Sequence, residues 1–380
     1  MQIRGSTLVV NKLLRFLRSF MNKTGRLRIL IIGPSAGYIS GSLLRPLNIW
    51  YSLKDLSKAS VKYAPISSVV HILLYVRDIG KADIIIISGI NPWVATAAAI
   101  LGKAFRRTVI VDFHGFSWYE AYFDYHQAFY MKLILLISEY LTYRLADHVI
   151  TASTWLANTL REYFKVRKNV QVIPNSTTLL FEKLVHRLRR YDLQLLRKLS
   201  CRRLSLAKSC KDINILLAPL PKVFTSNLVA FEWLIRLSKP FLKKSLIIVT
   251  GIDAHEVSVE NVVVVGYLPY TLYVVLLLAA DAVILPYPSN AICGGARNKV
   301  LEAGYCGKAV ISTRTGMLFT DALPGVHYVY LLDEGVENKL SNEEYLTRIG
   351  ANLQELIKQR YTYRAFKEKL LRFIVYEVLK

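Results

Sequence analysis

The amino-acid sequence predicts an α/β protein with two doubly wound domains, each built on a parallel β-sheet. Short apolar runs, such as ADIIIIS at residues 82–88 and AVIL at residues 282–285, alternate with longer segments of helical character. Strands that are apolar on both faces are typical of parallel sheets covered by helices on both sides. The chain has 380 residues, which exceeds the size at which one hydrophobic core usually stops growing. The apolar fraction of 53% and the mean hydropathy of +0.30 supply enough material for two cores.

In the first half of the chain, the alternation starts at residue 28. We expect strands at residues 28–32, 82–88, 108–112, 147–151 and 170–173. A glycine-bearing turn at residues 33–38 precedes a helix, and further helices are expected at residues 91–102, at residues 130–145 and after residue 151. The uncharged run at residues 84–102 is as long as a membrane span, but Gly89 and Pro92 interrupt it. We therefore interpret it as a strand, a turn and a helix.

Residues 181–212 break this alternation, with ten lysine and arginine residues against three aspartate and glutamate residues. The alternation then resumes. We expect strands at residues 213–218, 246–250, 262–265, 282–285 and 309–312, and helices at residues 227–237, 270–280 and 299–306. Gly266 and Pro269 interrupt a second uncharged run, at residues 261–280, which is also interpreted as strand, turn and helix.

The pattern divides the chain into a terminal segment, a first domain, a basic linker or insertion, a second domain and a C-terminal helix. Their ranges are 1–25, 26–180, 181–212, 213–360 and 361–380. The C-terminal helix either stays with the second domain or crosses back to the first. Residues 1–25 combine apolar side chains with interleaved lysine and arginine, which suits a helix on anionic lipid, a helix packed against its own protein, or a frayed tail. They carry no secretory cleavage site.

The formal net charge of +23 favours partners that carry phosphate, namely nucleotides, nucleic acid or anionic lipid headgroups. A nucleic-acid-binding protein is the less favoured alternative, because the basic residues concentrate in the linker and at the chain ends and no reader motif is present. The four cysteines form no CxxC pair, so we expect free thiols and a reducing, cytoplasmic compartment.

Residues 281–316 carry the strongest chemical signal. A strand is followed by a loop with Gly294 and Gly295, and then by a helix near Lys299. Glycines before a helix let backbone N–H groups approach a phosphate, and Arg297 and Lys299 add positive charge at the same place. Glu302, one turn into the helix, can accept hydrogen bonds from two adjacent hydroxyls of a ribose or a sugar. The alternative interpretation is an ordinary loop followed by an exposed glutamate.

This segment resembles the donor-binding region of glycosyltransferase family 4, in which G-x-R-x-K-x-L-E-A precedes a strand and a glycine loop. The matching residues here are Gly295, Arg297, Lys299, Leu301, Glu302, Ala303, Gly307, Lys308, Val310, Ile311, Ser312, Thr313 and Gly316. The resemblance implies that Glu302 binds the nucleotide ribose and that Lys299 or Arg297 meets the diphosphate. The family often carries a second glutamate eight residues earlier, where this chain has Gly294.

Other segments resemble the same family in the same order along the chain. They are Glu139 with residues 143–153, the Ile-Pro-Asn sequence at residues 173–175, and Gly266 with residues 272–273 and 279–281. The resemblance covers about residues 27–330. It implies a GT-B fold, in which two Rossmann-like domains face a central cleft, and retention of the anomeric configuration.

In the first domain, His114 follows the strand at residues 108–112, at the edge where parallel sheets bind ligands. The resemblance implies that this histidine contacts the donor sugar or assists the reaction; the alternative is a loop histidine that contacts only its neighbours. Asp112 and Glu120 are weaker candidates for orienting the acceptor. Gly37, in the first glycine loop, is a candidate for contact with phosphate or acceptor. Lys222 is a candidate for neutralising the leaving diphosphate.

The sequence contains no Asp-x-Asp pair, which enzymes that hold a sugar nucleotide through a metal usually need. We therefore expect no metal and no cofactor beyond a nucleoside-diphosphate sugar. The expected function is transfer of the sugar to a hydroxyl of a glycan or lipid-linked acceptor, with peripheral association at the inner face of the cell membrane. A non-catalytic sugar-nucleotide-binding protein is the alternative that Gly294 keeps open.

Overall fold

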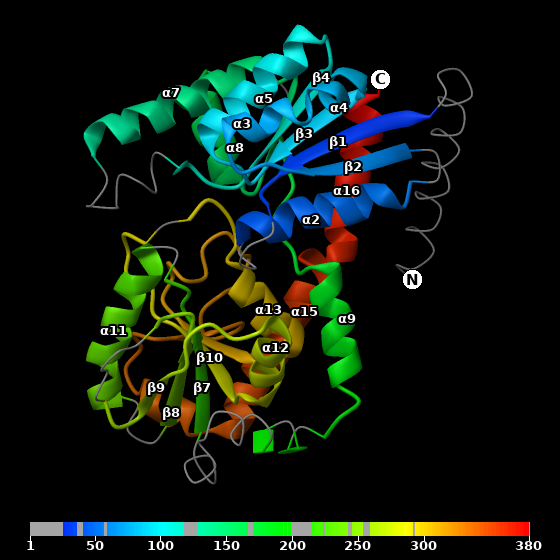
Figure 1. Cartoon of the computed structure of the whole chain (residues 1–380). Helices are drawn as coiled ribbons and strands as arrows, with labels where there is room; N and C mark the ends of the chain where they lie inside the picture. The colour runs from blue at the N-terminus through cyan, green and yellow to red at the C-terminus, as the bar shows by residue number, and fades with distance from the viewer. Residues whose placement is uncertain are drawn as a thin grey trace. The chain divides into compact units, whose positions relative to one another are not determined.

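The computed structural model describes residues 26–35, 41–56, 59–117, 128–165, 170–192, 194–195, 197–198, 214–222, 225–241, 245–253, 259–291 and 293–379. The chain divides into two compact units (Figure 1). Unit 1 comprises Met1–Pro174 and Arg364–Lys380, and unit 2 comprises Asn175–Tyr363. The expected terminal segment at residues 1–25 lies outside the described residues.

Unit 1 is built on a six-stranded sheet in which every neighbouring pair of strands is parallel. The strand order is β2-β1-β3-β4-β5-β6. The strands are β1 (Leu27–Gly33), β2 (Ala59–Pro65), β3 (Ile84–Ser88), β4 (Thr108–Phe113), β5 (His148–Thr151) and β6 (Val170–Val172). The order reverses at β1, as in doubly wound sheets, which bind ligands beyond the carboxyl ends of their strands.

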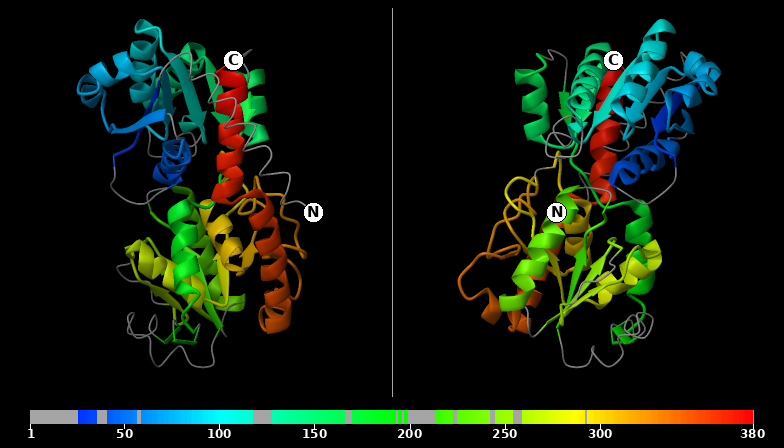
Figure 2. Two further views of the ribbon diagram at one scale, coloured as in Figure 1. Left: turned by 90° about the vertical axis from the view of Figure 1, so that its right-hand side faces the viewer. Right: turned by 60° about the vertical axis from the view of Figure 1, so that its left-hand side comes forward.

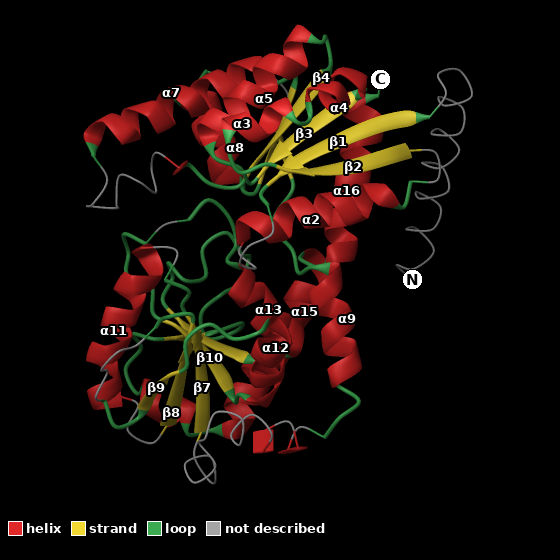
Figure 3. Cartoon of the chain, in the orientation of Figure 1, coloured by secondary structure: helices red, strands yellow, loops and turns green. Residues whose placement is uncertain are grey.

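The alternation of side chains along these strands assigns the helices of unit 1 to two faces of the sheet. Ile29, Ile31 and Ile84 pack with α2 (Gly41–Lys54), α16 (Tyr363–Phe373) and the π-helix η1 (Ile374–Val378). Leu30, Ile32 and Ile85 pack in the other layer. That layer contains α3 (Val69–Leu73), α4 (Val76–Lys81), α5 (Pro92–Ala104), α7 (Phe129–Leu145) and α8 (Thr154–Glu162). Figure 3 shows these helices in red.

The C-terminal helix therefore belongs to the core of unit 1. Phe366, Leu370 and Phe373 are buried among the strand isoleucines, although more than 200 residues separate them from β4. Figure 2 shows this helix, drawn in red, beside the strands of unit 1.

Unit 2 contains a second six-stranded parallel sheet, in the order β12-β11-β10-β7-β8-β9. Its strands are β7 (Asn214–Pro219), β8 (Ser245–Thr250), β9 (Val262–Val264), β10 (Ala282–Leu285), β11 (Ala309–Ser312) and β12 (Val329–Tyr330). Its helices are α9 (Leu179–Leu188), α11 (Thr225–Phe241), α12 (Tyr270–Ala279), α13 (Asn298–Cys306), α14 (Val336–Leu340) and α15 (Glu343–Arg360). One continuous cluster of buried side chains joins them to the sheet.

The predicted fold class of two α/β units with parallel sheets is confirmed. Both long uncharged runs fold as predicted, the first as β3 and α5 and the second as β9 and α12. Among the described residues, no helix is long and apolar enough to cross a membrane. The edge strand β2 was not predicted, because its side chains are only partly buried and its sequence, ASVKYAP, has no continuous apolar run.

The segment expected to be a basic linker begins with a helix that belongs to unit 2. Helix α9 buries Phe181, Val185 and Leu188 in the core of that unit. The division between the units falls between Pro174 and Asn175, before this helix, rather than after residue 180. Composition alone does not reveal this apolar stripe, because basic residues occupy the other faces of α9.

Helices α13 and α15 cross at two glycines. A Cβ atom on Gly304 would lie 2.6 Å from Cγ1 of Ile357, and a Cβ atom on Gly350 would collide with the Gly307 carbonyl. Gly307 ends α13 in a left-handed conformation with φ of +79°, which favours glycine. Because α13 carries the strongest site candidates, this close packing fixes where they lie.

We predict that Gly350→Ala lowers the free energy of unfolding by about 1–3 kcal/mol, because its new methyl group meets backbone that cannot rotate away. Thermal or urea unfolding measures this change. Gly80→Ala in α4 is the matched control, because its Cβ atom would lie 3.6 Å from the Phe105 ring, an ordinary contact. The control should leave stability unchanged or raise it by up to about 1 kcal/mol. Equal effects of the two substitutions would contradict the packing argument.

Candidate functional site

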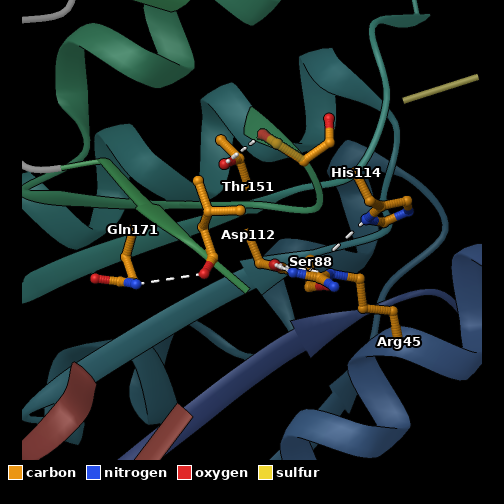
Figure 4. Close-up of polar contacts among 8 residues, drawn as sticks. Arg45, Ser88, Asp112, His114, Thr151 and Gln171 are labelled. Carbon is orange, nitrogen blue, oxygen red and sulfur yellow. Dashed lines mark hydrogen bonds and ion pairs between the residues drawn. The ribbon is translucent and has the colours of Figure 1, made fainter. Parts of the chain in front are cut away.

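A buried ion pair lies at the carboxyl ends of β3 and β4 in unit 1 (Figure 4). Nη2 of Arg45, from α2, donates to Oδ1 of Asp112 at 2.8 Å, and Nε lies 3.0 Å from both carboxylate oxygens. The hydroxyl of Ser88 donates to Oδ2 of Asp112 at 2.6 Å. The Arg45 guanidinium carbon also lies 5.4 Å from the centre of the Phe366 ring in α16. The two charged side chains are 4% and 0% exposed, and residues of α2, β3, β4 and α16 surround this pair.

His114 follows β4 directly and lies beside the ion pair. Its Nδ1 is 3.9 Å from Oδ2 of Asp112, which is too long for a hydrogen bond, and Nδ1 has no hydrogen-bond partner within the described ranges. The pKa of His114 is lowered to about 4, mainly by burial, with the Asp112 charge opposing this effect and the Arg45 charge adding to it. The imidazole is therefore neutral at pH 7 and its buried nitrogen has capacity for one more hydrogen bond.

The second group of candidates surrounds the N-terminus of α13 in unit 2. Arg297 is the N-cap residue, and its side chain does not cap the helix. The guanidinium instead donates to the Ala291 carbonyl and stacks over the Tyr287 ring, 3.6 Å from its centre. Gly294 and Gly295 are buried in the preceding loop. Helix N–H groups without a side-chain cap favour an anion at this position.

Lys299 extends across the carboxyl ends of β7 and β10. Its Nζ donates to the Pro219 carbonyl at 2.5 Å, to the Tyr287 hydroxyl at 2.7 Å and to Oδ1 of Asn227 at 3.1 Å. All three acceptors are neutral. Burial, with the neighbouring Arg297 charge, holds the pKa of Lys299 well below its usual value. An anion brought to this place would therefore stabilise the charged ammonium.

Glu302 lies one turn further along α13 and is almost completely buried. Its two oxygens accept hydrogen bonds from the hydroxyls of Tyr270 and Tyr273 of α12, at 3.0 and 2.8 Å. Burial raises the pKa of Glu302 to about 7, although the two tyrosines and Lys299 lower it. One carboxylate thus accepts hydrogen bonds from two hydroxyl groups. The two adjacent hydroxyls of a ribose or another sugar could donate to it in the same way.

The remaining candidates of unit 2 lie at the same edge of its sheet. The Thr313 hydroxyl, after β11, donates to the Tyr287 carbonyl and accepts from the Gly316 N–H. Gly316 cannot carry a side chain, because its Cβ atom would collide with the Ser312 hydroxyl and lie 2.9 Å from the Leu285 carbonyl. Lys222 follows β7, is half exposed and forms an ion pair with Asp253.

The structure brings the predicted residues together within each unit. His114 and Asp112 lie together in unit 1, while Arg297, Lys299, Glu302 and Thr313 lie around one sheet edge in unit 2. Gly37 and Glu120 lie outside the described residues. The sequence analysis missed the residues that hold these candidates in place. They are Arg45, Ser88, Asn227, Tyr270 and Tyr287.

No group of three or more histidine, cysteine, aspartate or glutamate side chains within the described part of the chain is arranged to hold a metal ion. The carboxylates of the candidate site are instead held by an arginine, a serine and two tyrosines. The prediction that catalysis needs no metal is not tested by this arrangement.

Comparison with known proteins supplies a family for part of the chain. Residues 50–176 match the family described as a glycosyl transferase 4-like domain. This match lies in unit 1 and includes Asp112 and His114. The resemblance to glycosyltransferase family 4 is thereby confirmed for these residues. No curated protein matches the chain.

Solved structures share the fold of the whole chain. Sucrose-phosphate synthase from Thermosynechococcus elongatus is 14% identical, with a TM-score of 0.66 over 91% of this chain and 97% of that one. The N-terminal domain of Candida albicans trehalose-6-phosphate phosphatase is 14% identical, with a TM-score of 0.54 over 92% and 96% of the two chains. TarM of S. aureus, in complex with Fondaparinux, α-GlcNAc-glycerol and UDP, is 13% identical, with a TM-score of 0.54 over 80% and 58%. At these identities the likeness shows the fold, which is GT-B.

We predict that Arg45→Met lowers the free energy of unfolding by about 3–5 kcal/mol, because it leaves the buried Asp112 carboxylate without its cation. Urea unfolding measures this change. Arg360→Met is the control, since Arg360 pairs with Asp321 at 2.7 Å but both side chains are more than half exposed. The control should cost less than about 1 kcal/mol. If Arg45→Met lowers the free energy of unfolding no more than the control does, the buried ion pair does not stabilise unit 1 as argued.

The raised pKa of Glu302 predicts a pH dependence of stability. From its ordinary pKa of 4.5 up to about 7, the folded chain retains a proton that the unfolded chain has released. Raising the pH through this window therefore lowers the free energy of unfolding, by about 3 kcal/mol in total. Glu302→Gln should remove this contribution, measured by urea unfolding at both ends of the window. Glu355→Gln, an exposed residue of α15, should behave as the wild type.

Proposed function

We propose that this glycosyltransferase moves a sugar from a nucleoside-diphosphate sugar to a hydroxyl group of a glycan or lipid-linked acceptor. Unit 2 binds mainly the donor, and unit 1 binds the acceptor. The acceptor hydroxyl oxygen forms a bond to the anomeric carbon, while the bond from that carbon to the diphosphate breaks. The nucleoside diphosphate leaves with the electron pair of that bond and takes up the proton that the hydroxyl loses.

The observation that supports this proposal most directly is the set of groups around α13. Arg297 and Lys299 lie at the helix N-terminus, and Glu302 lies four residues after the first helical position, Asn298. Four residues of helix rise roughly 6 Å. A diphosphate and the ribose attached to it can span that distance, with the anion at the helix N-terminus and the sugar hydroxyls at the carboxylate.

The two tyrosines of α12 support the assignment of Glu302 to the ribose. Tyr270 and Tyr273 donate to the two carboxylate oxygens in the structure. The two hydroxyls of a ribose can replace them or share the oxygens with them, since an ionised carboxylate accepts about four hydrogen bonds. Donor affinity should therefore fall as the pH falls below about 7, because Glu302 becomes protonated and loses acceptor capacity.

The leaving diphosphate gains charge during the reaction, and the cations of unit 2 stabilise it there. In this proposal Lys299 and Arg297 carry most of the effect, because they lie at the helix N-terminus. Lys222 contributes from the adjacent loop, after exchanging its partner Asp253 for phosphate. We propose that these positive groups serve in place of a metal ion, and that the anomeric configuration is retained.

In unit 1, His114 is the group proposed to contact the reacting sugars. Its neutral imidazole can donate or accept a hydrogen bond. Asp112, held by Arg45 and Ser88, keeps a fixed negative charge beside the ring. Gly37 and Glu120 stay candidates for the acceptor side.

The experiment is a thermal-shift screen against UDP, GDP, ADP and their common sugar conjugates, with wild type, Glu302→Gln and Glu355→Gln. A ligand at a hundred times its dissociation constant stabilises the folded chain by about 2.7 kcal/mol. We expect one base to shift the melting temperature of the wild type and of Glu355→Gln, and to shift that of Glu302→Gln much less. If no nucleotide shifts any of the three proteins, the donor site is wrong.

Turnover of the donor identified in this way then separates an enzyme from a binding protein. Transfer or donor hydrolysis above background, with loss on Lys299→Met, supports the enzyme. Donor binding without either reaction supports a non-catalytic sugar-nucleotide-binding protein, which Gly294 in place of a second glutamate favours. In the same assay, an effect of EDTA would contradict metal independence, and an inverted product in NMR would contradict retention.

We also propose that the acceptor is reached at a membrane surface on the cytoplasmic side. The net charge of +23 supports attraction to anionic lipid. In this proposal the association is peripheral.

A further inference from the structure

Helix α7 turns its more apolar face to the solvent. Its exposed side chains include Phe129, Leu133, Ile137 and Leu141, of which Phe129 is 80% and Ile137 49% exposed. Each of these four residues is four positions from the next, which places them on one side of the helix. Tyr130, Ile134 and Tyr140 are also exposed and extend the same stripe. A helix on the surface of a soluble domain normally shows the opposite arrangement.

The inward face of α7 is more polar than its outward face. Ser138, Glu139 and Thr142 are buried there. The Thr96 hydroxyl of α5 bonds the Ser138 carbonyl and the Thr142 hydroxyl, each at 2.8 Å, and Glu139 accepts from the Ser117 N–H at 2.7 Å. These hydrogen bonds fix the rotation of α7 about its axis. The apolar stripe therefore faces outward as a consequence of specific polar contacts.

The neighbouring helices extend this apolar surface. Helix α5 contacts both α3 and α7, and the three lie in one layer on the same side of the sheet (Figure 1). Ile100 of α5 is exposed, as are Val70 and Leu73 of α3 and its C-cap residue Leu74. We call the outward side of these three helices the α3–α5–α7 face. Exposed apolar side chains that gather on neighbouring helices mark an interaction site on a folded protein.

The charges of the α3–α5–α7 face identify its partner. The three helices contain Lys103, Lys132 and Arg144, and their one carboxylate is the buried Glu139. Lys103 pairs with Asp147, two residues after α7, so Lys132 and Arg144 supply the positive charge of α7 itself. A surface that combines exposed aromatic and aliphatic side chains with positive charge suits the boundary between the headgroups and acyl chains of an anionic bilayer. A second copy of the chain would instead bring the same positive charges against the first.

We propose that the α3–α5–α7 face binds the surface of an anionic membrane and seats unit 1 on it. Helix α7, roughly 26 Å long, lies parallel to the bilayer with its stripe among the lipid headgroups. Tyr130 and Tyr140 lie at the level that tyrosine prefers, with the ring in the apolar region and the hydroxyl in water. This surface consists entirely of described residues. It is independent of the identity of the sugar donor.

The test is co-flotation of the full chain with vesicles of phosphatidylcholine alone and of phosphatidylcholine mixed with phosphatidylglycerol. The variant Ile137→Glu/Leu141→Glu places two carboxylates on the face. The matched control, Leu323→Glu/Leu332→Glu, makes the same change of charge at two exposed apolar residues of unit 2. We expect the wild type and the control to bind the anionic vesicles more tightly than the neutral ones. The α7 variant should bind the anionic vesicles at least tenfold more weakly.

A second variant, Ile137→Ser/Leu141→Ser, adds no charge and separates lost apolar contact from electrostatic repulsion; it should also weaken binding. Circular dichroism and the melting temperature verify that each variant is folded. Unchanged vesicle binding of the α7 variants would overturn the proposal and assign membrane binding to another part of the chain. Equal binding of the wild type to neutral and anionic vesicles would overturn the electrostatic part. A wild-type dimer that the α7 substitutions convert to a monomer, in ultracentrifugation without lipid, would make the face a subunit interface.

Discussion

Every strand in the two sheets runs parallel to its neighbours, and this constraint places the candidate residues. Parallel strands have all their carboxyl ends at one edge, so the loops that follow them meet there. In unit 1, Asp112 is the penultimate residue of β4, His114 follows that strand, and Ser88 ends β3. In unit 2, Lys299 contacts Pro219 at the end of β7 and Tyr287 just after β10, while Thr313 follows β11. Candidate side chains that are spread over some hundred residues of sequence therefore lie along a single edge of each sheet.

Burial has different consequences for the charged groups at these two edges. Asp112 has a full counter-charge in Arg45 and a hydroxyl donor in Ser88, so its negative charge is stable without a ligand. Lys299 and Glu302 have only neutral hydrogen-bond partners at close range, and burial shifts the pKa of each toward its neutral form. An anionic ligand near Lys299 would offset the cost of burying its charge. Unit 1 thus holds a fixed, preorganised charge, whereas the charged state of unit 2 is coupled to what binds there.

Buried polar groups need hydrogen-bond partners, and this requirement also determines how α5 and α7 pack together in unit 1. The buried Thr96, Ser138 and Thr142 need partners, and they find them in one another between α5 and α7. Satisfying these groups fixes which side of α7 faces inward, and its aliphatic and aromatic side chains are then left outside. In this way polar contacts in the interior create an apolar exterior, in a domain whose proposed substrate lies at a membrane.

The sequence by itself determined most of the strands and helices, the parallel character of both sheets and the glycine-containing loop before α13. These features depend on apolar periodicity and on turn residues, which act over a few neighbouring positions. It did not determine the edge strand β2, whose side chains are half exposed, or the return of the C-terminal helix to the core of unit 1.

The tertiary structure also decided which partners hold the site. Arg45 reaches Asp112 across 67 positions, and Lys299 reaches the Pro219 carbonyl across 80. Both faces of α7 are rich in apolar residues, so its outward side depended on hydrogen bonds to α5. Contacts of this kind join residues that are far apart in the sequence. They depend on the tertiary fold, which local sequence patterns do not specify.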